Sequence, residues 1–519
     1  MLSGVALGVL TGFDRLMFRG HLRTLSYPQG MQLYCSTNGV LLKDFKKHAL
    51  ERTEQLIAGS EAMVQRLGRP NEYLRSPQTR KEEVARARAQ QDGITDGLIG
   101  MFRCVEPCWS YTVRGNRESK KLELRLELRK CLHLYHYYQH PVFGMMYARV
   151  QTWFPFTIQI GINGREWLCR SLGQAGMRFR RSDNCVTWVE DLVIAQKLLD
   201  DQLRVNWSGL LDEVRGWIHP THEKLLGKFR VDYYWSLTQS EWATDVLFRD
   251  RQSVQHRYGN WLRFAMANYT GPDVLRFLGK KTPALDRVNG NFAGEVLSDL
   301  GHRVDGLRIK HRAGENAIKM YDKAGGSVLR VETTINDPSM FKVYRAKEGE
   351  ESGAKEWRVL RLGVADIHRR AEVSQAANER YLEGLAAVAH GESLREVTAG
   401  LSKRVKEPGV GGRYVRGLNV LGDDGALLAI VGRPEFALNG VRNRDVVAGL
   451  YGKAATAAAE QKRRCAHVTR LLRLLRAHGL LHKVQRSHLY RVSDHGRIVI
   501  AAVLAARNAT TEQLVAKAI

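Results

Sequence analysis

The sequence predicts a multidomain α+β protein with a central mixed or antiparallel sheet and a C-terminal winged helix-turn-helix domain. The chain has 519 residues, 44% of them hydrophobic, which is enough for two to four domains with their own cores. In stretches such as "LELRLELR", apolar and charged residues alternate with a period of two, which is typical of a strand with one solvent-exposed face. The C-terminal part has the order helix, helix, β-ribbon, helix, as in winged helix-turn-helix modules.

Five consecutive segments follow from these patterns. Residues 1–95 are expected to form an N-terminal strand and charged helices. Residues 96–345 are expected to form the central α+β domain, with a cationic sheet face. A helical segment over 346–395 and a glycine-rich, charged linker over 396–432 precede the winged helix domain at 433–519.

Several motifs within the central segment predict particular elements. The aromatic, histidine-rich "HLYHYYQHP" is expected to be a core strand, with stacking on nucleobases or metal binding as the alternatives. "INGREW" offers a tight Asn163–Gly164 turn, which favours a hairpin. "EWATDVLF" and "PDVLRFLG" are expected to be helices.

"KMYDKAGGSVLRVETTIN" predicts a hairpin that turns at Gly325 and Gly326. Its register would place Lys323 opposite Val328, Tyr321 opposite Arg330 and Lys319 opposite Glu332. Side chains alternate along a strand, so one face of this hairpin would be apolar and the other basic. The preceding run "LRIKHR" fits a third strand that extends both faces.

The basic face is a candidate phosphate-binding platform with Glu332 inside it. Tyr321 could stack on a base while Glu332 orients Lys319 or Arg330. A solvated face with cross-strand ion pairs is the alternative. The nucleic-acid-binding residues predicted here are Arg308, Lys310, Arg312, Lys319, Lys323 and Arg330.

A metal-dependent enzyme is the second hypothesis, with Glu332, Tyr321 and Asp14 as the candidate catalytic residues. Glu332 could hold Mg²⁺ for phosphodiester cleavage, a chemistry that normally needs two or more carboxylates. Asp14 could be the first-strand metal ligand of a ribonuclease-H-like nuclease, with Glu332 as a distant partner. Alternatively, Asp14 forms an ion pair with Arg15 or Arg19. Mg²⁺ is the one cofactor that this hypothesis implies.

The predicted winged helix domain is rich in cations. "QKRRCAHVTRLLRLLRAHGL" predicts a helix that ends at Gly479 and carries an apolar stripe, with basic residues largely off that stripe. A basic turn then joins two strands. Because neutralised phosphates release counterions, such residues favour duplex DNA or structured RNA. The candidates are Arg463, Arg464, His467, Arg470, Arg473, Arg486 and His488.

Whole-chain composition also points to a polyanionic partner. The chain has 80 Lys and Arg against 54 Asp and Glu, a net charge of +26. A surplus of this size usually faces a polyanion, and nucleic acid is the commonest one. "MLSGVALGVLTGF" has no basic residue before its apolar run, and no stretch approaches the roughly 18 to 20 uncharged residues of a spanning helix. We therefore expect a cytoplasmic protein without a membrane partner; its oligomeric state is not indicated.

The seven cysteines are an odd, scattered set, which argues against a disulfide framework. Cys104 and Cys108 in "CVEPC" could begin a metal site, but no second Cys or His pair follows at zinc-like spacing. Reduced structural thiols are therefore expected.

Two resemblances complete the sequence evidence. "FDRLMFRG", "INGREW" and "KMYDK…LRVETTIN", followed by the terminal winged helix, resemble a widespread family of bacterial proteins known chiefly as hypothetical proteins. That resemblance implies a shared architecture and a bacterial or mobile-element setting, and it implies no reaction. The "YDK" strand followed by "LRVE" is also similar, more weakly, to rolling-circle replication initiators of phages and plasmids.

The second resemblance implies that Tyr321, Lys323, Arg330 and Glu332 belong to a DNA-processing sheet. Those nickases hold their metal with two histidines that flank one apolar residue. Here "HLYH" has two intervening residues and "HPTH" contains a proline. The sequence thus predicts a DNA- or RNA-binding protein of mobile-element, defence or replication type. One form of this hypothesis makes the protein part of a ribonucleoprotein. A metal-dependent nuclease or strand-transferase is the alternative, and a transcription regulator is a third reading.

Overall fold

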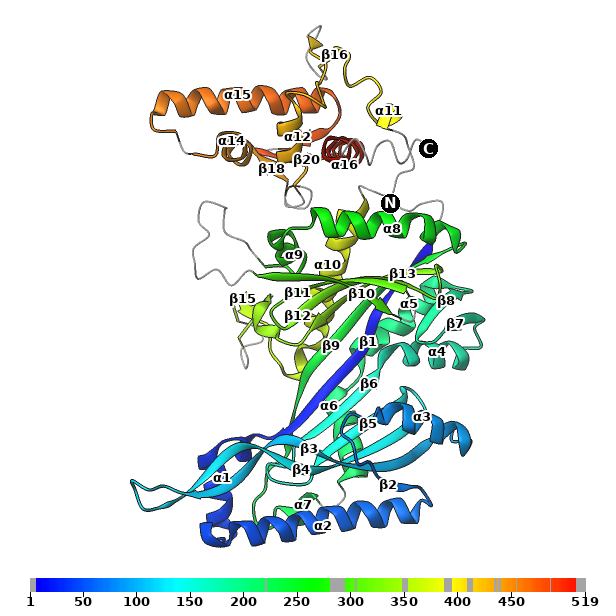
Figure 1. The fold of residues 1–519 in the computed structure, drawn as a ribbon, viewed down its shortest axis with the longest axis vertical. Coiled ribbons are helices and arrows are strands. Elements are labelled where there is room, and N and C mark those ends of the chain that lie inside the picture. The colour runs from blue at the N-terminus through cyan, green and yellow to red at the C-terminus, as the bar shows by residue number, and fades with distance from the viewer. Residues whose placement is uncertain are drawn as a thin grey trace.

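The computed structural model describes residues 6–219, 222–280, 295–303, 306–347, 353–386, 394–407, 414–433, 436, 440–453, 455–485 and 487–509. Within these residues the protein is mixed α+β, as the sequence predicts. Eleven strands form one large sheet in the order β10-β11-β12-β13-β9-β1-β6-β5-β4-β3-β2 (Figure 1). Every neighbouring pair is antiparallel except β2 and β3, which are parallel.

The sheet is built from segments that are far apart in the sequence. Its first strand, β1, lies in the middle, between β9 and β6, and Figure 1 shows β1 and β9 running diagonally through the molecule. The strands are β1 (Ala6–Leu22), β2 (Asn71–Tyr73), β3 (Gly97–Gly115), β4 (Leu122–His140), β5 (Gly144–Gln151), β6 (Ile158–Asn163), β9 (Tyr233–Phe248), β10 (Val296–Arg303), β11 (Gly306–Ala313), β12 (Asn316–Lys323) and β13 (Val328–Ile335).

Helices cover both faces of the sheet, so its central strands are buried on both sides. We call one face of the sheet the inner face. The helices that pack against it and form hydrophobic cores with it are α1 (Pro28–Thr37), α2 (Phe45–Arg66), α6 (Trp207–Ile218), α8 (Gln252–Asn268), α9 (Gly271–Phe277) and α10 (Ile367–Ala386). The opposite face, called the site face below, is covered by α3 (Lys81–Gln91), α4 (Gly164–Gln174), α5 (Leu192–Asp200) and the hairpin of β7 (Phe179–Ser182) and β8 (Cys185–Val189).

The C-terminal part has its own hydrophobic core and forms a separate group at the top of Figure 1. Its small sheet has the order β18-β20-β19. The elements are α11 (Leu394–Val397), α12 (Gly425–Val431), β18 (Val441–Arg442), α14 (Asn443–Tyr451), α15 (Ala458–Ala477), β19 (Leu481–Lys483), β20 (Leu489–Val492) and α16 (Asp494–Asn508). Val397 of α11 and the helix α12 contribute to this core, although they lie in the segment 396–432 that is predicted as a linker.

Shorter elements complete the described chain. Two-stranded pairs are formed by β14 (Lys342–Arg345) with β15 (Glu356–Val359), and by β16 (Val405–Lys406) with β17 (Tyr414–Val415). The four-residue helix α7 (His222–Leu225) follows α6.

The register predicted for the β12–β13 hairpin is confirmed. Lys319 lies opposite Glu332, Tyr321 opposite Arg330 and Lys323 opposite Val328. The turn differs from a simple two-residue turn, because Ala324 has a positive φ as well as Gly325 and Gly326. The apolar face of the hairpin packs into the inner-face core, as expected.

Two local predictions are wrong. "EWATDVLF" forms the second half of β9, not a helix. Both faces of this strand are covered, so almost every side chain is buried and the alternation that reveals a half-exposed strand is lost. "INGREW" is not a hairpin turn: Asn163 caps α4, and its side chain accepts hydrogen bonds from the backbone of Arg165 and Glu166.

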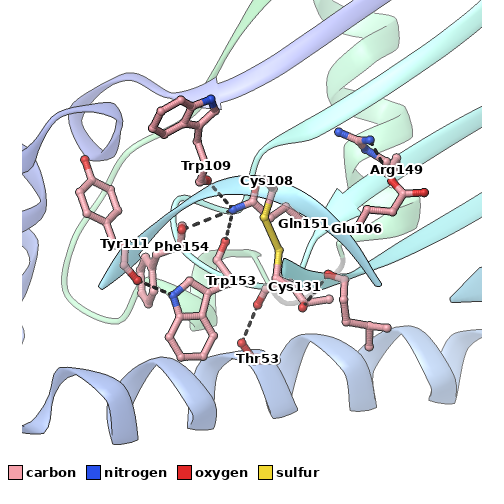
Figure 2. Close-up of a disulfide and its surroundings, with 12 residues drawn as sticks. Thr53, Glu106, Cys108, Trp109, Tyr111, Cys131, Arg149, Gln151, Trp153 and Phe154 are labelled. Carbon is pink, nitrogen blue, oxygen red and sulfur yellow. Dashed lines mark hydrogen bonds and ion pairs between the residues drawn. A yellow bond between two sulfur atoms is a disulfide. The ribbon is translucent and has the colours of Figure 1, made fainter. Parts of the chain in front are cut away.

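The expectation of reduced thiols is also wrong for one pair. Cys108 of β3 and Cys131 of β4 form a disulfide, with 6.7 Å between their Cα atoms. Figure 2 shows it beside Gln151, whose amide donates to the carbonyls of Trp109 (3.1 Å) and Trp153 (3.0 Å). Cys35, Cys104, Cys169, Cys185 and Cys465 are free.

Candidate functional site: a buried carboxylate cluster

Four carboxylates from three adjacent strands meet on the site face at the centre of the sheet. Asp14 comes from β1, Glu241 and Asp245 from β9, and Glu332 from β13. The register places Asp245 directly opposite Arg330 of β13. Asp14, Asp245 and Glu332 are buried, so the charges in this cluster must be balanced by neighbouring cations and hydrogen bonds.

Arg330 is the central cation of the cluster and is fully buried. Its Nε and Nη2 donate to the two carboxylate oxygens of Asp245 at 2.6 and 2.8 Å, and its Nη1 donates to Asp14 at 3.3 Å. Arg165, at the start of α4, lies 3.3 Å from Asp245 and donates to the Ala243 carbonyl at 2.7 Å. Burial would raise the pKa of Asp245, but the two guanidinium groups outweigh it and lower that pKa.

Asp14 lies at a β-bulge. Phe13 pairs with Trp242 and Arg15 with Glu241, so Asp14 is the extra residue between them. A bulge re-aims a side chain, and here it brings the carboxylate to the site face, where Asn184 of the β7–β8 turn donates to it at 2.8 Å. Burial raises the pKa of Asp14 to about 6, although the Arg330 guanidinium opposes this and the nearby Glu332 adds to it.

Glu332 and Glu241 share one ammonium group. Lys319 Nζ lies 2.5 Å from Glu332 and 3.0 Å from Glu241, and the Tyr321 hydroxyl donates to Glu332 at 2.6 Å. Burial acts to raise the pKa of Glu332, but Lys319 and these hydrogen bonds hold it at about 2. The carboxylate is therefore an ion at neutral pH.

The arrangement fits a hard divalent cation in ligand type and spacing. Oxygen atoms of Asp14, Glu241 and Glu332 lie within 4.8 Å of one another. Mg²⁺ takes oxygen ligands at about 2.0–2.1 Å in an octahedron, so opposite ligands are roughly 4 Å apart. Lys319 bridges two of the three carboxylates. A cation bound here would take over the charge balance that Lys319 provides.

A cavity of about 1110 Å³ reaches this cluster. Asp14, Arg15 and Asn184 line it at the cluster, and α3 with Tyr135, Tyr137 and Tyr147 lines it on the side of β4 and β5. Most cations around it are already paired, including Lys81 with Glu106 (2.8 Å). The cavity therefore gives access to Asp14 without being strongly cationic.

The structure brings the three predicted catalytic residues, Asp14, Tyr321 and Glu332, into one cluster. Glu332 is far from Asp14 along the chain but near it in space, because β13 and β1 both flank β9. One detail of the prediction is wrong: the ion pair of Asp14 is formed with Arg330, not with Arg15 or Arg19.

The predicted cationic platform is not an open surface at its centre. Arg330 is buried, the Lys319 side chain is 12% exposed, and Lys323 lies near Asp183 (3.7 Å) and over the Tyr321 ring. The reason is that α4, α5 and the β7–β8 hairpin cover this face. Arg308 and Arg312 lie near Asp299 at 4.0 and 3.6 Å. Burial and the positive charges of Lys319, Arg312 and Arg308 lower the pKa of Lys310.

The structure shows four members of the cluster that the sequence analysis missed: Glu241, Asp245, Arg165 and Asn184. The first two lie in the stretch predicted as a helix. Read with a period of two, Glu241, Ala243 and Asp245 share a face, and that signal could have found them. Arg165 and Asn184 have no comparable sequence signal, because they reach the cluster from covering elements.

The candidate residues of the C-terminal part divide into two groups. Arg463, His467, Arg470 and His488 are exposed. Arg464 donates to the Lys453 carbonyl and pairs with Glu460, and Arg473 pairs with Glu407 at 2.5 Å. Arg486 lies outside the described residues.

Comparison of the chain with protein-family models, curated proteins and solved structures finds no match. The family resemblances drawn from the motifs therefore stay predictions. Over the described ranges, no helix has the length and apolar character needed to cross a membrane.

Proposed function

We propose that this protein binds nucleic acid, DNA or RNA, through a winged helix-turn-helix formed by residues 425–508. The order α12, β18, α14, α15, β19, β20, α16 and the sheet order β18-β20-β19 support this proposal. In such modules the helix at the position of α15 enters a groove, and the β-ribbon contacts the backbone.

The observation that carries the proposal is a cationic stripe on α15. At 100° per residue, Arg463, His467 and Arg470 lie within about 60° of one another. They line a hollow of about 310 Å³ together with Tyr451, Glu460 and Arg464. The Arg464 guanidinium lies 4.6 Å from the centre of the Tyr451 ring, and the Tyr451 hydroxyl is 2.8 Å from His467. These contacts position the wall of the hollow, while Arg463 and Arg470 remain available to phosphates.

A salt titration tests the proposal. Neutralised phosphates release counterions, so the double variant Arg463→Gln, Arg470→Gln should weaken binding to duplex DNA or RNA and flatten the plot of log K against log salt by up to about two units. Fluorescence anisotropy with labelled duplexes of both kinds gives the affinity at each salt concentration.

Arg476→Gln and Arg473→Gln provide matched controls. Arg476 is exposed on the same helix but lies about 220° around it from Arg463, and Arg473 is held by Glu407. Each should leave the slope nearly unchanged. An unchanged slope in the double variant would show that this stripe does not meet phosphates.

The second candidate function is metal-dependent phosphodiester chemistry at the carboxylate cluster. The spacing of Asp14, Glu241 and Glu332 specifically favours it. When bound, Mg²⁺ would polarise a phosphoryl oxygen or lower the pKa of a bound water. Asp14, Glu241 and Glu332 would hold the ion in place of the Lys319 ammonium group, while Arg330 stays paired with Asp245 and the Tyr321 hydroxyl orients Glu332.

Cleavage assays separate this candidate from binding alone. Labelled single-stranded and duplex DNA and RNA are incubated with the protein in Mg²⁺ or in EDTA. If the site is catalytic, Glu332→Gln should reduce Mg²⁺-dependent cleavage by at least about a hundredfold, because it removes a charged metal ligand. The α15 double variant should retain cleavage of short substrates. The absence of metal-dependent cleavage of every substrate would remove the enzymatic candidate and leave the binding proposal standing.

A further inference from the structure

A second cluster of potential metal ligands lies away from the carboxylates, on the β3–β4 ribbon. Ligand atoms of Cys108, Cys131 and His133 lie within 4.8 Å of one another. The register places Cys131 opposite Glu106 and Cys108 opposite Arg129, so the two cysteines are diagonal neighbours on one face. His133 follows Cys131 by two residues and therefore shares that face.

His133 has the environment of an unused ligand. The residue is fully buried, and its ring nitrogens make no hydrogen bond of good geometry within the described residues, although the ring interacts with the backbone of Cys131. A buried imidazole that is so poorly satisfied is costly, and such a group in a native structure calls for an explanation. The imidazole ring is a common metal ligand through either of its nitrogens.

We propose that, when the disulfide is reduced, Cys108, Cys131 and His133 form a binding site for a thiophilic divalent cation such as Zn²⁺. Zinc takes thiolate sulfur at about 2.3 Å and imidazole nitrogen at about 2.0–2.1 Å in a tetrahedron, which separates neighbouring ligand atoms by roughly 3.5–3.8 Å. Small side-chain movements within the observed 4.8 Å satisfy this geometry. The described residues supply three ligands here, so a water molecule would complete the tetrahedron.

Glu106 is engaged elsewhere and does not supply the fourth ligand. Lys81 lies 2.8 Å from one of its oxygens, and the Tyr135 hydroxyl and Arg149 donate to the other at 2.6 and 3.3 Å. The site is thus a two-thiolate, one-imidazole set, which prefers zinc to the oxygen-binding Mg²⁺ of the carboxylate cluster.

The two states of the site exclude each other. A dithiol reductant transfers two electrons and two protons to the Cys108–Cys131 bond and becomes a disulfide itself, which leaves two thiols. Zinc then displaces both thiol protons to solvent and binds the two sulfurs as thiolates. Either state links β3 to β4, so the ribbon is cross-linked under oxidising conditions by the disulfide and under reducing conditions by the metal. Cys131 is half-buried and gives the reductant access.

The test measures zinc binding by the full-length protein before and after reduction by a dithiol, with the reductant removed without oxygen. Competition with a chromogenic zinc indicator should show one tightly held equivalent in the reduced protein and none at this site in the oxidised protein. Cobalt in place of zinc should give a thiolate-to-metal charge-transfer band. His133→Asn should weaken binding at least about tenfold, and Cys108→Ser, Cys131→Ser should abolish the band.

Cys465→Ser, remote from the ribbon, is the control and should change neither readout. Alkylation of the reduced wild-type protein, mapped by mass spectrometry, needs no variant: zinc should protect Cys108 and Cys131 from the reagent while Cys465 reacts. Equal alkylation of Cys108 and Cys131 with and without zinc, or a reduced protein that binds no more zinc than the oxidised one, would overturn the proposal.

Discussion

At the scale of single residues, Asp14 shows how burial tunes one group of a charged cluster. Its carboxylate shares Arg330 with Asp245, and Arg330 is bidentate to Asp245. Asp14 therefore receives the weaker share of the compensating charge. Burial raises its pKa from 3.8 to about 6, whereas Glu332, with Lys319 and Tyr321 as direct partners, stays near 2. The cluster thus holds one carboxyl that can take up a proton under mildly acidic conditions.

This difference predicts a pH-dependent effect of Asp14→Asn. Between about pH 4 and pH 6 the folded protein binds the Asp14 proton more tightly than the unfolded chain does, so the free energy of unfolding falls as the pH rises. The asparagine side chain does not titrate, so the free energy of unfolding of the variant does not show this fall. Its stability relative to wild type should therefore increase by on the order of 2–3 kcal/mol between about pH 4 and pH 7, measured by urea unfolding in EDTA.

Glu332→Gln is the comparison within the same cluster. The folded pKa of Glu332 is depressed, so its stabilising contribution is lost as the pH falls from about 4.5 toward 2. Above pH 5 the stability difference between this variant and wild type should stay nearly constant. A constant difference for Asp14→Asn as well would show that Asp14 is ionised in the folded protein throughout that range.

At the scale of elements, the β12–β13 hairpin carries the largest share of the cluster and depends on its turn. The backbone amide of Gly326 donates to the Asp322 side chain at 2.8 Å. Gly326 has φ +97°, and a Cβ there would lie 2.9 Å from the Arg251 carbonyl oxygen. Since that oxygen belongs to the backbone at the start of α8, it cannot move away easily. The turn therefore requires glycine at 326 for both conformation and space.

We accordingly expect Gly326→Ala to destabilise the protein by about 2–3 kcal/mol, measured by urea unfolding. Gly325→Ala is the matched control, because Gly325 has φ +61° with open space around its Cβ position. It should cost only about 1 kcal/mol. Equal costs at the two positions would mean that the contact with the Arg251 carbonyl does not constrain the turn.

Elements with a strong local sequence signal are easier to predict than elements that are buried on both faces. The hairpin register and α15 are confirmed by the structure, since their periodicity or glycine positions are local signals. The strand β9 is missed because its two faces are both buried. The pairing of Cys108 with Cys131 is missed because an odd, scattered set of cysteines carries no signal of pairing, whereas the register makes these two residues diagonal neighbours across two strands.

At the scale of the whole molecule, the cations behind the net charge of +26 differ in their surroundings: some are buried or paired, and others are exposed. Arg330 and Arg165 are buried and bound to Asp245, and many other arginines form surface pairs. Arg463 and Arg470 lie on an outer helix around a hollow. Cations of this second kind are those available to a phosphate polymer, which is why the salt-slope experiment targets α15 rather than the central sheet.

The α+β class, most of the strongly periodic elements and the hairpin register follow from the sequence alone, as do five candidate members of the carboxylate cluster: Asp14, Lys319, Tyr321, Arg330 and Glu332. Their convergence comes from the tertiary fold: Arg330 and Asp14 are 316 positions apart and meet because β13, β9 and β1 are neighbours in one sheet. The fold also buries the centre of the basic face and places Glu241 and Asp245 there. Periodicity indicates which side of an element faces solvent, whereas packing between segments that are distant along the chain selects the partner of each face.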